Sequence, residues 1–455
     1  MDVEISPGSS LRGSVAVPGD KSIAHRWLIL AATALGRSQI TGAPPSLDVR
    51  STARCLAGLA PKARPSLDVF ALNGASPVEG SGSTWNEGVD GPALRMLQVE
   101  GEGRTGLVAP TAPLDCGNSG TSMRLLAGVL ASVPFRTVLT GDESLSSRPM
   151  ERVARPLREM GASITTIDGH APIEVEGGAL HGITFVPDVP TAQVKSAVLL
   201  AGLAADGETT VREPAPTRDH TERALRALGA PIEIEPEGIR VRAFQHGGFA
   251  GSVPGDPSSA AFLVAAAALT RSALVIHNVG LNPSRLRFLD VMERMGVRTA
   301  CSVERAEVGE PVGTIEVERC DGILPVCIGP GELPLVIDEV PILAALAVHA
   351  RSESWFLDAH ELRVKESDRL TALVAAIRGL GGAAADEGND LVVAGMGLTG
   401  GRAESSGDHR IAMAMVVAAL GADGPSRIEG VEAADVSFPG FVQTLRKLGA
   451  AVGEA

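Results

Sequence analysis

The sequence lacks the features that mark membrane-spanning, secreted and disulfide-rich proteins. Its longest apolar stretches, such as Ala260–Leu269, run to about ten residues, whereas a membrane span needs about 20. Its start, MDVEISPGSSLRG, has no basic segment followed by an apolar one, unlike a secretory signal peptide. Its five cysteines are odd in number and include no CxxC pair, which argues against a disulfide framework or a zinc site. These absences predict a cytoplasmic globular protein.

Positive charge is also in short supply. The chain has 54 Asp plus Glu against 40 Lys plus Arg, a formal net charge of −14, and no basic run. Such a chain is a poor nucleic-acid binder, although it can bind a small anion where single cations converge. Only five of the basic residues are lysines, and Lys21 and Lys365 lie in the polar motifs described below. Because most basic residues of this chain are arginines, a lysine in these motifs indicates that a compact or titratable charge is needed there.

What the sequence does contain is an internal repeat. An apolar, helix-forming stretch ends in glycine five times and in alanine once, at Gly161, Gly229, Gly296, Gly381, Gly449 and Ala60. Glycine directly after such a stretch is typical of a helix C-terminus, and the alternating apolar residues that follow predict hairpin strands. The repeat of about 68 residues predicts an α/β protein with six units, and leaves open a solenoid or a closed pseudo-symmetric arrangement.

One interval of the repeat is longer than the others. The stretch from Ala60 to Gly161 has about 33 surplus residues, and residues 61–103 are rich in Gly, Pro and Ser. This composition predicts a loop insertion around residues 61–103, outside the repeating unit.

Polar turns interrupt the repeats where helices are expected to begin. In GDKSIAHR, Lys21 and Ser22 follow a turn at Gly19, which suits an anion because helix dipole and donors act together. Only Asp20 separates Gly19 from Lys21, so the segment departs from a nucleotide-binding P-loop. In LDCGNSGTSMR, the turn around Gly120 brings backbone amides close to a ligand. An ordinary capped helix remains an alternative interpretation of each segment.

Two further motifs precede predicted helices. In SSRPM, Pro149 is expected at the first helical position, which makes Arg148 the cap. In TAQVKSAVLLAGL, Thr191 is expected to cap an apolar helix with Gln193 in its first turn. A surface arginine and a plain capped helix are the alternative interpretations.

Carboxylates stand out in two motifs toward the C-terminus. In IDEVPILA, Asp338 lies between two apolar runs, where a carboxylate is capping or paired, or else has its pKa raised by burial. In RVKESDRL, Lys365 and Arg369 are expected on one face of an amphipathic helix while Glu366 points elsewhere, although a solvated helix face also explains these charges.

If these helix starts face a common cleft, they form one anion site. Its cations would be Lys21, Arg26, Arg148, Lys365, Arg369 and Arg410. So many cations imply substrates that carry phosphate and carboxylate groups together. Arg410 precedes the apolar run IAMAMVVAAL, and an arginine buried there needs an anionic partner. Asp338 and Glu366 remain for proton transfer, and no metal-ligand cluster or nucleophilic triad is indicated.

The motifs GDKSIAHR, LDCGNSGTSMR, SSRPM, TAQVKSAVLLAGL, IDEVPILA, RVKESDRL and GDHRIAM occur in this order. Together they closely resemble the 5-enolpyruvylshikimate-3-phosphate synthases, within the enolpyruvyl transferases, over the whole chain except residues 61–103. The resemblance implies a two-lobed α/β fold with a sixfold βαβαββ repeat, an inside-out α/β barrel with three units per lobe. It implies one lobe of residues 1–19 and 254–455, a second of residues 20–253, and an active site in the cleft between them.

The resemblance also implies a reaction. The enolpyruvyl group of phosphoenolpyruvate is transferred to the 5-hydroxyl of shikimate 3-phosphate through a tetrahedral intermediate, and phosphate is released. The reaction needs no cofactor or metal and belongs to aromatic amino-acid biosynthesis. The enzyme is expected to be a monomer. The residues implied for acid–base steps are Lys21, Asp338 and Glu366. Those implied for shikimate 3-phosphate are Lys21, Ser22, Arg26, Thr191, Ala192, Gln193, Asp338 and Lys365. Those implied for phosphoenolpyruvate are Lys21, Gly120, Arg148, Gln193, Arg369 and Arg410.

The chain departs from the family pattern at two places. Thr191-Ala192 stands where Ser-Ser or Ser-Ala is common, and VEAADVSFPGF lacks a lysine that some members place beside phosphoenolpyruvate. Two alternatives remain. The sister enzyme that acts on UDP-N-acetylglucosamine has Lys-Asn where this chain has Lys21-Ser22, and usually a reactive cysteine in the loop at residues 141–148. An inactive relative that only binds phosphorylated metabolites would not need both Asp338 and Glu366.

Overall fold

The computed structural model describes residues 1–60 and 96–455, which form two compact units that are treated separately below. Unit 1 consists of Met1–Pro18, Pro254–Ala306 and Pro311–Ala455, and unit 2 of Gly19–Val253 and Glu307–Glu310. Residues 61–95, which hold most of the predicted insertion, lie outside the described residues. Each unit is therefore assembled from separate stretches of chain.

Six sheets of the described chain share one strand pattern, in which a parallel pair of strands continues into antiparallel neighbours. Two of the sheets of unit 2 have the orders β5 (Leu114–Asp115), β6 (Arg136–Thr140), β8 (His170–Glu176), β7 (Ser163–Ile167) and β10 (Thr184–Phe185), β12 (Glu208–Val211), β14 (Gly238–Arg242), β13 (Ile232–Glu235). β9 (Leu180–His181) and β11 (Ala205–Asp206) pair in parallel and form a separate two-stranded sheet.

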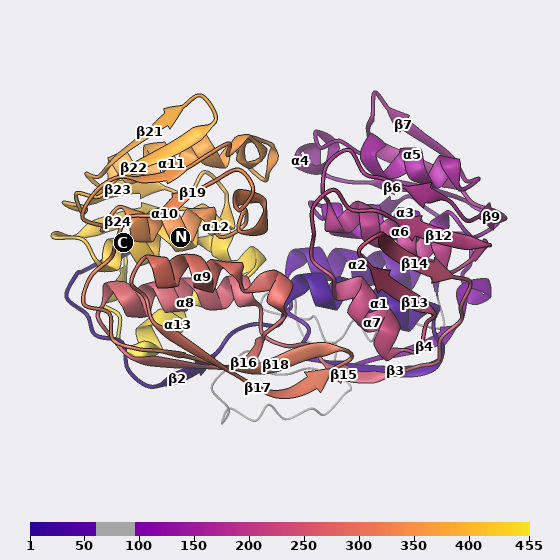
Figure 1. Ribbon diagram of the computed structural model, residues 1–455, viewed down its shortest axis with the longest axis horizontal. Coiled ribbons are helices and arrows are strands. Elements are labelled where there is room, and N and C mark those ends of the chain that lie inside the picture. Colours follow the sequence, from indigo (N-terminus) through magenta and orange to yellow (C-terminus); the bar gives the residue numbers. More distant parts are fainter. Residues whose placement is uncertain (61–95) are drawn as a thin grey trace, which may run out of the picture. The chain divides into compact units, whose positions relative to one another are not determined.

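Unit 1 repeats the pattern. Two of its sheets have the orders β19 (Cys327–Ile328), β20 (Ser354–Phe356), β22 (Asp390–Ala394), β21 (Ala383–Glu387) and β23 (Gly401–Glu404), β24 (Ser426–Glu429), β1 (Val3–Ile5), β25 (Val452–Glu454). The third has the order β17 (Thr299–Glu307), β18 (Glu310–Val317), β16 (Leu274–Gly280), β2 (Ser14–Ala16). The recurring topology confirms the α/β class and the internal repeat (Figure 1).

The first and fourth repeats exchange a strand where the chain passes between units. β2 pairs in parallel with β16, and β15 (Ala250–Ser252) pairs in parallel with β3 (Leu35–Thr41). β2 precedes α1, the first helix of unit 2, but belongs to a sheet of unit 1. In the same way, β15 precedes α8, a helix of unit 1, but belongs to a sheet of unit 2. The sheet that contains β2 and β16 therefore joins stretches of unit 1 that lie before and after unit 2 in the sequence, whereas β15 and β3 both lie within Gly19–Val253.

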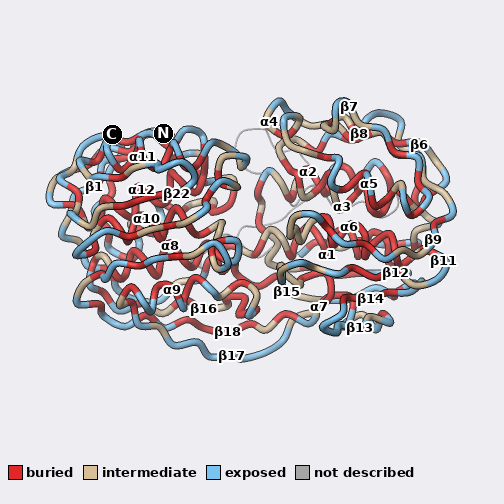
Figure 2. The backbone as a smooth tube through the Cα atoms, turned by 45° about the horizontal axis from the view of Figure 1, so that its top comes forward, coloured by how far each residue is buried: buried red, intermediate tan, exposed pale blue. Residues whose placement is uncertain are grey.

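Each repeat supplies one inner and one outer helix. The inner helices are α1 (Lys21–Thr33), α3 (Gly120–Leu130), α6 (Ala192–Gly202), α8 (Pro257–Leu269), α10 (Val340–Ala347) and α12 (His409–Leu420). The outer helices are α2 (Leu47–Leu59), α5 (Glu151–Glu159), α7 (His220–Ala227), α9 (Arg287–Arg294), α11 (Arg369–Gly379) and α13 (Phe441–Leu448). Inner helices are buried around most of their circumference, whereas outer helices bury one face (Figure 2). None of the helices in the described ranges is long and apolar enough to cross a membrane.

The predicted helix ends are confirmed. The five repeat glycines all have positive φ, with values from 77° to 111°, as a left-handed residue after a helix requires. They are Gly161, Gly229, Gly296, Gly381 and Gly449. In the degenerate copy, α2 ends at Leu59 and Ala60 has a φ of −131°, so alanine stops this helix without the left-handed turn.

The predicted loop at residues 61–103 is wrong for its last part. Residues Leu97–Glu102 form β4, which pairs antiparallel with β3. Leu97 and Val99 are buried on alternate positions, and a Cβ on Gly101 would come within 2.4 Å of the Ala34 carbonyl oxygen. The alternation in LQVEGE is a strand pattern, and the Gly-rich residues around it obscured the signal.

A buried histidine lies at the junction of the first three helices of unit 2. His25 Nδ1 is 2.6 Å from Thr52 Oγ1, which is itself 2.6 Å from Ser122 Oγ, so α1, α2 and α3 are joined by one hydrogen-bonded chain. Burial lowers the pKa of His25 from 6.5 to about 4. The folded protein therefore keeps this imidazole neutral at a pH where the unfolded chain protonates it.

This difference predicts a pH-dependent stability. Between pH 6.5 and about pH 4 the unfolded chain binds a proton at His25 that the folded chain does not, so the free energy of unfolding falls as the pH falls. We expect His25→Gln to remove up to about 1.4 kcal/mol per pH unit from that slope, measured by urea unfolding at several pH values. Thr52→Val is the control: it removes the hydrogen bond but keeps the imidazole, and the slope should persist. Equal slopes for wild type and His25→Gln would contradict the prediction.

Candidate active site

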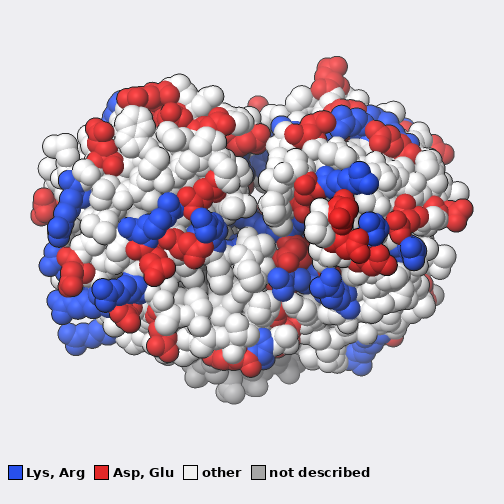
Figure 3. Space-filling view, viewed as in Figure 1, with Lys and Arg blue, Asp and Glu red and all other residues white. Residues whose placement is uncertain are grey.

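Cations and acids are interspersed on the face of the protein shown in Figure 3. SSRPM and RVKESDRL precede the outer helices α5 and α11, whereas the other five polar motifs lie at the N-termini of inner helices. Four of these helices begin with a capping side chain, from Asp20, Ser119, Asp256 or Asp408. At α6 and α10 no side chain makes a capping hydrogen bond. At α10 the N–H of Val340 donates to the main-chain oxygen of Val336, and Pro341 has no N–H, whereas the first-turn N–H donors of α6 are left to a ligand or to water.

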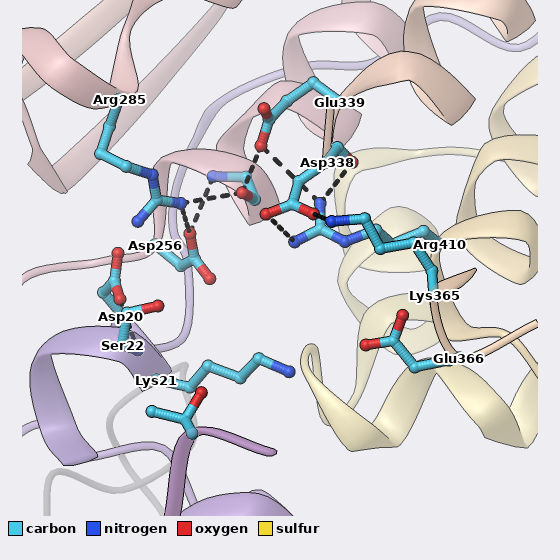
Figure 4. Close-up of polar contacts among 12 residues, drawn as sticks. Asp20, Lys21, Ser22, Asp256, Arg285, Asp338, Glu339, Lys365, Glu366 and Arg410 are labelled. Carbon is cyan, nitrogen blue, oxygen red and sulfur yellow. Dashed lines mark hydrogen bonds and ion pairs between the residues drawn. The ribbon is translucent and has the colours of Figure 1, made fainter. Parts of the chain in front are cut away.

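In unit 1, three cations surround the carboxylate of Asp338. Lys365 Nζ lies 3.7 Å from Asp338 Oδ1, and Arg410 Nη2 lies 3.9 Å from Oδ2 (Figure 4). Arg369 Nη1 lies 3.8 Å from Asp338 Oδ1. The Asp338 side chain is 18% exposed, so its oxygens are accessible while its charge is compensated. The structure thus brings together four residues that the sequence predicted as parts of one site.

Arg369 is the most tightly held of these cations. Its side chain is 1% exposed, its Nε donates to Asp408 Oδ2 at 2.7 Å, and its Nη2 donates to Glu366 Oε2 at 2.5 Å. Burial by itself would lower the pKa of Arg369, but the carboxylates of Glu366, Asp408 and Asp338 raise it above its ordinary value. Its Nη1 is buried without a hydrogen-bond partner among the described residues, as expected of a donor reserved for a ligand.

Arg410 is buried and has anionic partners, as the sequence predicted for a buried arginine. Its side chain is 8% exposed, and Nη1 donates to the main-chain oxygen of Asp338 at 2.6 Å. The same nitrogen lies 3.7 Å from Glu339 Oε1. The prediction of an anionic partner for this arginine is confirmed.

In unit 2, the start of α1 carries two predicted cations. Lys21 Nζ forms an ion pair with Asp48 Oδ2 at 3.0 Å. Arg26 is buried, and burial lowers its pKa to about 10, which leaves it charged at neutral pH. Its Nη1 donates to the main-chain oxygen of Ser22 at 2.9 Å, and its Nε donates to Thr221 Oγ1 at 2.8 Å. Arg26 is therefore oriented by the protein before any ligand binds.

Gln193 is held by the neighbouring inner helix. Its Oε1 accepts from Arg124 Nη1 at 2.5 Å, and its Nε2 donates to Thr121 Oγ1 at 2.9 Å. A Cβ on Gly120 would lie 2.8 Å from Arg124 Nη1, so a larger residue there must displace the guanidinium. Burial lowers the pKa of Arg124 to about 10. Gly120 and Gln193, both predicted site residues, are thus linked through an arginine.

Two predicted residues, Thr191 and Ala192, open α6. Thr191 occupies the N-cap position, but the capping hydrogen bond expected of its side chain is not formed. One turn further on, Lys195 is buried and forms ion pairs with Glu222 at 2.6 Å and Glu213 at 2.8 Å. Burial raises the pKa of Glu222 despite this lysine. The lysine thus fixes the framework of α6.

Two expected helix positions are wrong. Arg148 is not a helix cap: α5 begins at Glu151 with Met150 at its N-cap, and Arg148 follows the short α4 (Glu143–Ser146). In this turn its Nη2 donates to Asn118 Oδ1 at 2.6 Å and to Ser144 Oγ at 3.2 Å. The α4 turn holds its side chain against the glycine loop instead of leaving it at a helix start.

Lys365 and Arg369 do not share a helix face. Lys365 ends the 3-10 helix His360–Val364, and α11 begins at Arg369 because the side chain of Asp368 accepts from the backbone N–H of Thr371. The cap breaks the helix between the two cations. They meet instead because both approach Asp338.

Sequence reasoning missed two residues that hold predicted site residues. Asp48 holds Lys21, and Arg124 holds Gln193. Arg124 was detectable, since it lies one helical turn after Gly120 and so on the same face. Asp48 carries no such signal, because its role depends on how α2 packs against α1. No group of His, Cys, Asp and Glu suited to a metal ion occurs in the part of the chain that the structure describes.

The chain matches a family model described as EPSP synthase (3-phosphoshikimate 1-carboxyvinyltransferase) over residues 5–73 and 93–445. It is 43% identical to the 3-phosphoshikimate 1-carboxyvinyltransferase of Acidithiobacillus ferrooxidans over 98% of this chain and 97% of that one. It is 44% identical to the protein of the same name from Halorhodospira halophila, over 98% of this chain and 96% of the relative.

Solved structures give the same result. EPSP synthase from Acinetobacter baumannii has a TM-score of 0.84 at 35% identity and covers 100% of both chains. The enolpyruvyl transferase NikO from Streptomyces tendae has a TM-score of 0.73 at 20% identity, over 99% of this chain and 98% of that one, which shows a shared fold.

Proposed function

Because the chain belongs to the EPSP synthase family, we propose that it is a transferase that moves the enolpyruvyl group of phosphoenolpyruvate to the 5-hydroxyl of shikimate 3-phosphate. Phosphate is the second product, and the reaction is a step of aromatic amino-acid biosynthesis. The coverage of almost the whole chain and of its relatives supports the complete reaction and not a binding function alone.

One observation carries this proposal at the level of the site. Asp338 and Glu366, the two candidate proton-transfer groups, both contact the buried Arg369, at 3.8 and 2.5 Å. Acid–base groups and an anion-binding guanidinium therefore share one place in unit 1. Such a combination suits a reaction that adds a hydroxyl to an anionic enol ether.

The substrates are assigned to groups by charge and donor type. Phosphoenolpyruvate, with phosphate and carboxylate ends, is held by Lys21, Gly120, Arg148, Gln193, Arg369 and Arg410. Shikimate 3-phosphate is held by Lys21, Ser22, Arg26, Thr191, Ala192, Gln193, Asp338 and Lys365. The uncapped start of α6 supports the role of Ala192, whose contribution is a backbone N–H. We propose, as the family likeness implies, that residues of both units serve one active site.

The chemistry consists of an addition and an elimination. In the addition, the 5-hydroxyl oxygen bonds to C2 of phosphoenolpyruvate, the hydroxyl proton passes to a base, and C3 takes up a proton to become a methyl group. In the elimination, the bond from C2 to the phosphate oxygen breaks, and the methyl group gives up a proton to restore the double bond. Asp338, Glu366 and Lys21 move these protons, while the arginines stabilise the departing phosphate.

The two alternatives are less well supported. No observation on the site favours UDP-N-acetylglucosamine as the acceptor, and the curated relatives named above are 3-phosphoshikimate 1-carboxyvinyltransferases. Phosphate release from phosphoenolpyruvate, measured alone, with shikimate 3-phosphate and with UDP-N-acetylglucosamine, separates all three functions. Release only with shikimate 3-phosphate is the expected result, and sedimentation of the same sample tests the predicted monomer.

Replacing Glu366 tests the acid–base role. Glu366→Gln keeps the size and an acceptor for Arg369 but cannot exchange a proton, so we expect kcat to fall by roughly 10²–10⁴-fold. The KM values for both substrates should change much less. Glu361→Gln, in the preceding 3-10 helix, is the control and should keep wild-type kcat. A kcat for Glu366→Gln within twofold of wild type would rule out its catalytic role.

Replacing Gly120 tests the phosphoenolpyruvate half of the site. Glyphosate carries phosphonate and carboxylate ends like phosphoenolpyruvate but is longer, so we expect wild-type inhibition that competes with phosphoenolpyruvate. The methyl of Gly120→Ala would stand 2.8 Å from Arg124 Nη1 and 3.6 Å from Leu145 Cδ1. It should weaken glyphosate more than tenfold, about 1.4 kcal/mol or more, while the phosphoenolpyruvate KM rises far less.

Inhibition assays on three proteins check this expectation. Gly178→Ala is the control, since an added Cβ there meets nothing within 4 Å, and its inhibition constant should equal that of wild type. A wild-type enzyme indifferent to millimolar glyphosate at low phosphoenolpyruvate, or a Gly120→Ala enzyme inhibited as strongly as wild type, would contradict the assignment.

A further inference from the structure

A buried polar chain in unit 1 ends on Arg410. Arg285, in the 3-10 helix Pro283–Arg285, donates from Nη2 to Asp256 Oδ1 and to Ser258 Oγ, both at 2.9 Å. Ser258 Oγ donates to Glu339 Oε1 at 2.5 Å, and Glu339 Oε1 lies 3.7 Å from Arg410 Nη1 (Figure 4). Four segments far apart in sequence are joined in this way.

The types of donor determine the direction of the hydrogen bonds in this polar chain. A guanidinium can only donate, so the hydroxyl of Ser258 accepts from Arg285 and gives its single proton to Glu339. Asp256 caps α8 by accepting from the backbone N–H of Ser258 at 2.8 Å, which fixes the position of the serine. Glu339 is therefore held by a serine hydroxyl that cannot turn away without also losing its hydrogen bond from Arg285.

Charge and burial make the cluster interdependent. The side chains of Arg285, Asp256, Glu339 and Arg410 are 3%, 8%, 5% and 8% exposed. Two positive and two negative charges thus lie together out of water, where each ionised group needs a partner of opposite sign. Among the ion pairs of Arg410 within residues 1–60 and 96–455, neutralising Glu339 leaves the one with the carboxylate of Asp338, at 3.9 Å.

Glu339 and its neighbour Asp338 contact the guanidinium of Arg410 in different ways. Arg410 Nη1 donates to the main-chain oxygen of Asp338 and faces the side chain of Glu339, while the Asp338 side chain points to Lys365 and Arg369. The main-chain oxygen of Asp338 and the side chain of Glu339 thus both face Arg410 Nη1.

We propose that Glu339 is a positioning residue for phosphoenolpyruvate binding. Backed by Ser258 and Arg285, it holds the Arg410 guanidinium in the orientation that receives the anionic substrate, and it touches no reacting atom itself. The inference rests on the proposed function, because it takes Arg410 as a ligand of phosphoenolpyruvate.

Steady-state kinetics with both substrates varied test this role. Glu339→Gln keeps the size and the acceptor for Ser258 but removes the charge that faces Arg410, so the phosphoenolpyruvate KM should rise by roughly tenfold. The shikimate 3-phosphate KM and kcat should stay within about twofold, because the groups that hold that substrate and move protons are unchanged. Ser258→Ala should shift the phosphoenolpyruvate KM in the same direction by a smaller factor.

A matched control is available in the same unit. Glu332 also holds two arginines, with Arg287 Nη2 at 2.8 Å and Arg294 Nη2 at 2.6 Å, but it lies outside the chain that ends on Arg410. Glu332→Gln removes the same charge and should leave both KM values at wild type. Arg410→Lys serves as the reference for losing the substrate contact, and in combination with Glu339→Gln its effect should be less than additive.

The outcomes are distinguishable. A lower kcat with an unchanged phosphoenolpyruvate KM for Glu339→Gln would mean fewer folded molecules and would overturn the positioning role. So would a phosphoenolpyruvate KM within twofold of wild type while Arg410→Lys raises it. If Glu339→Gln does not fold, Ser258→Ala decides by the same comparison. If wild type releases no phosphate that depends on shikimate 3-phosphate, the proposed function fails first and the inference falls with it.

Discussion

The pairing of backbone N–H groups at the starts of the inner helices is the constraint on which the rest of the structure depends. A helix begins with backbone N–H groups that have no partner within the helix, and burying them unpaired is costly. At α1, α3, α8 and α12 a side chain from Asp20, Ser119, Asp256 or Asp408 accepts these bonds. The apolar cores of both units therefore carry polar residues at defined points, and the site is assembled from those points.

Electrostatic order follows from the same constraint. Cations beside the helix starts are held by acids from other elements, as Lys21 is by Asp48 on α2 and Arg369 is by Asp408 at α12. Paired in this way, they stay charged and keep one orientation, so an anionic substrate meets donors that need little rearrangement. Arg124 differs, because its hydrogen bonds go to neutral groups, the amide of Gln193 and the carbonyl of Pro149.

What could be predicted from sequence depended on how local the cause was. Helix ends at glycines such as Gly229 and Gly381 were predictable, because one residue's left-handed conformation ends the helix. The family likeness predicted site residues within motifs, and four of them, Asp338, Lys365, Arg369 and Arg410, lie close together in unit 1. The helix start at Arg369 was mispredicted because Asp368 competes as a cap, and Asp48 was missed because only tertiary packing brings it to Lys21. Features set by neighbouring residues can be predicted from a sequence, whereas contacts between side chains of different helices and strands cannot.

The strand exchange at the crossings sets an order for assembly during synthesis. All three larger sheets of unit 2 lie within Gly19–Val253, so that unit can build them once β15 has left the ribosome. Unit 1 must wait much longer. Its β2 needs β16, and its β1 is flanked by β24 and β25, which lie near the other end of the sequence. The strands β1 and β2 are thus translated before the whole of unit 2, and each must wait until after unit 2 for its partner strands.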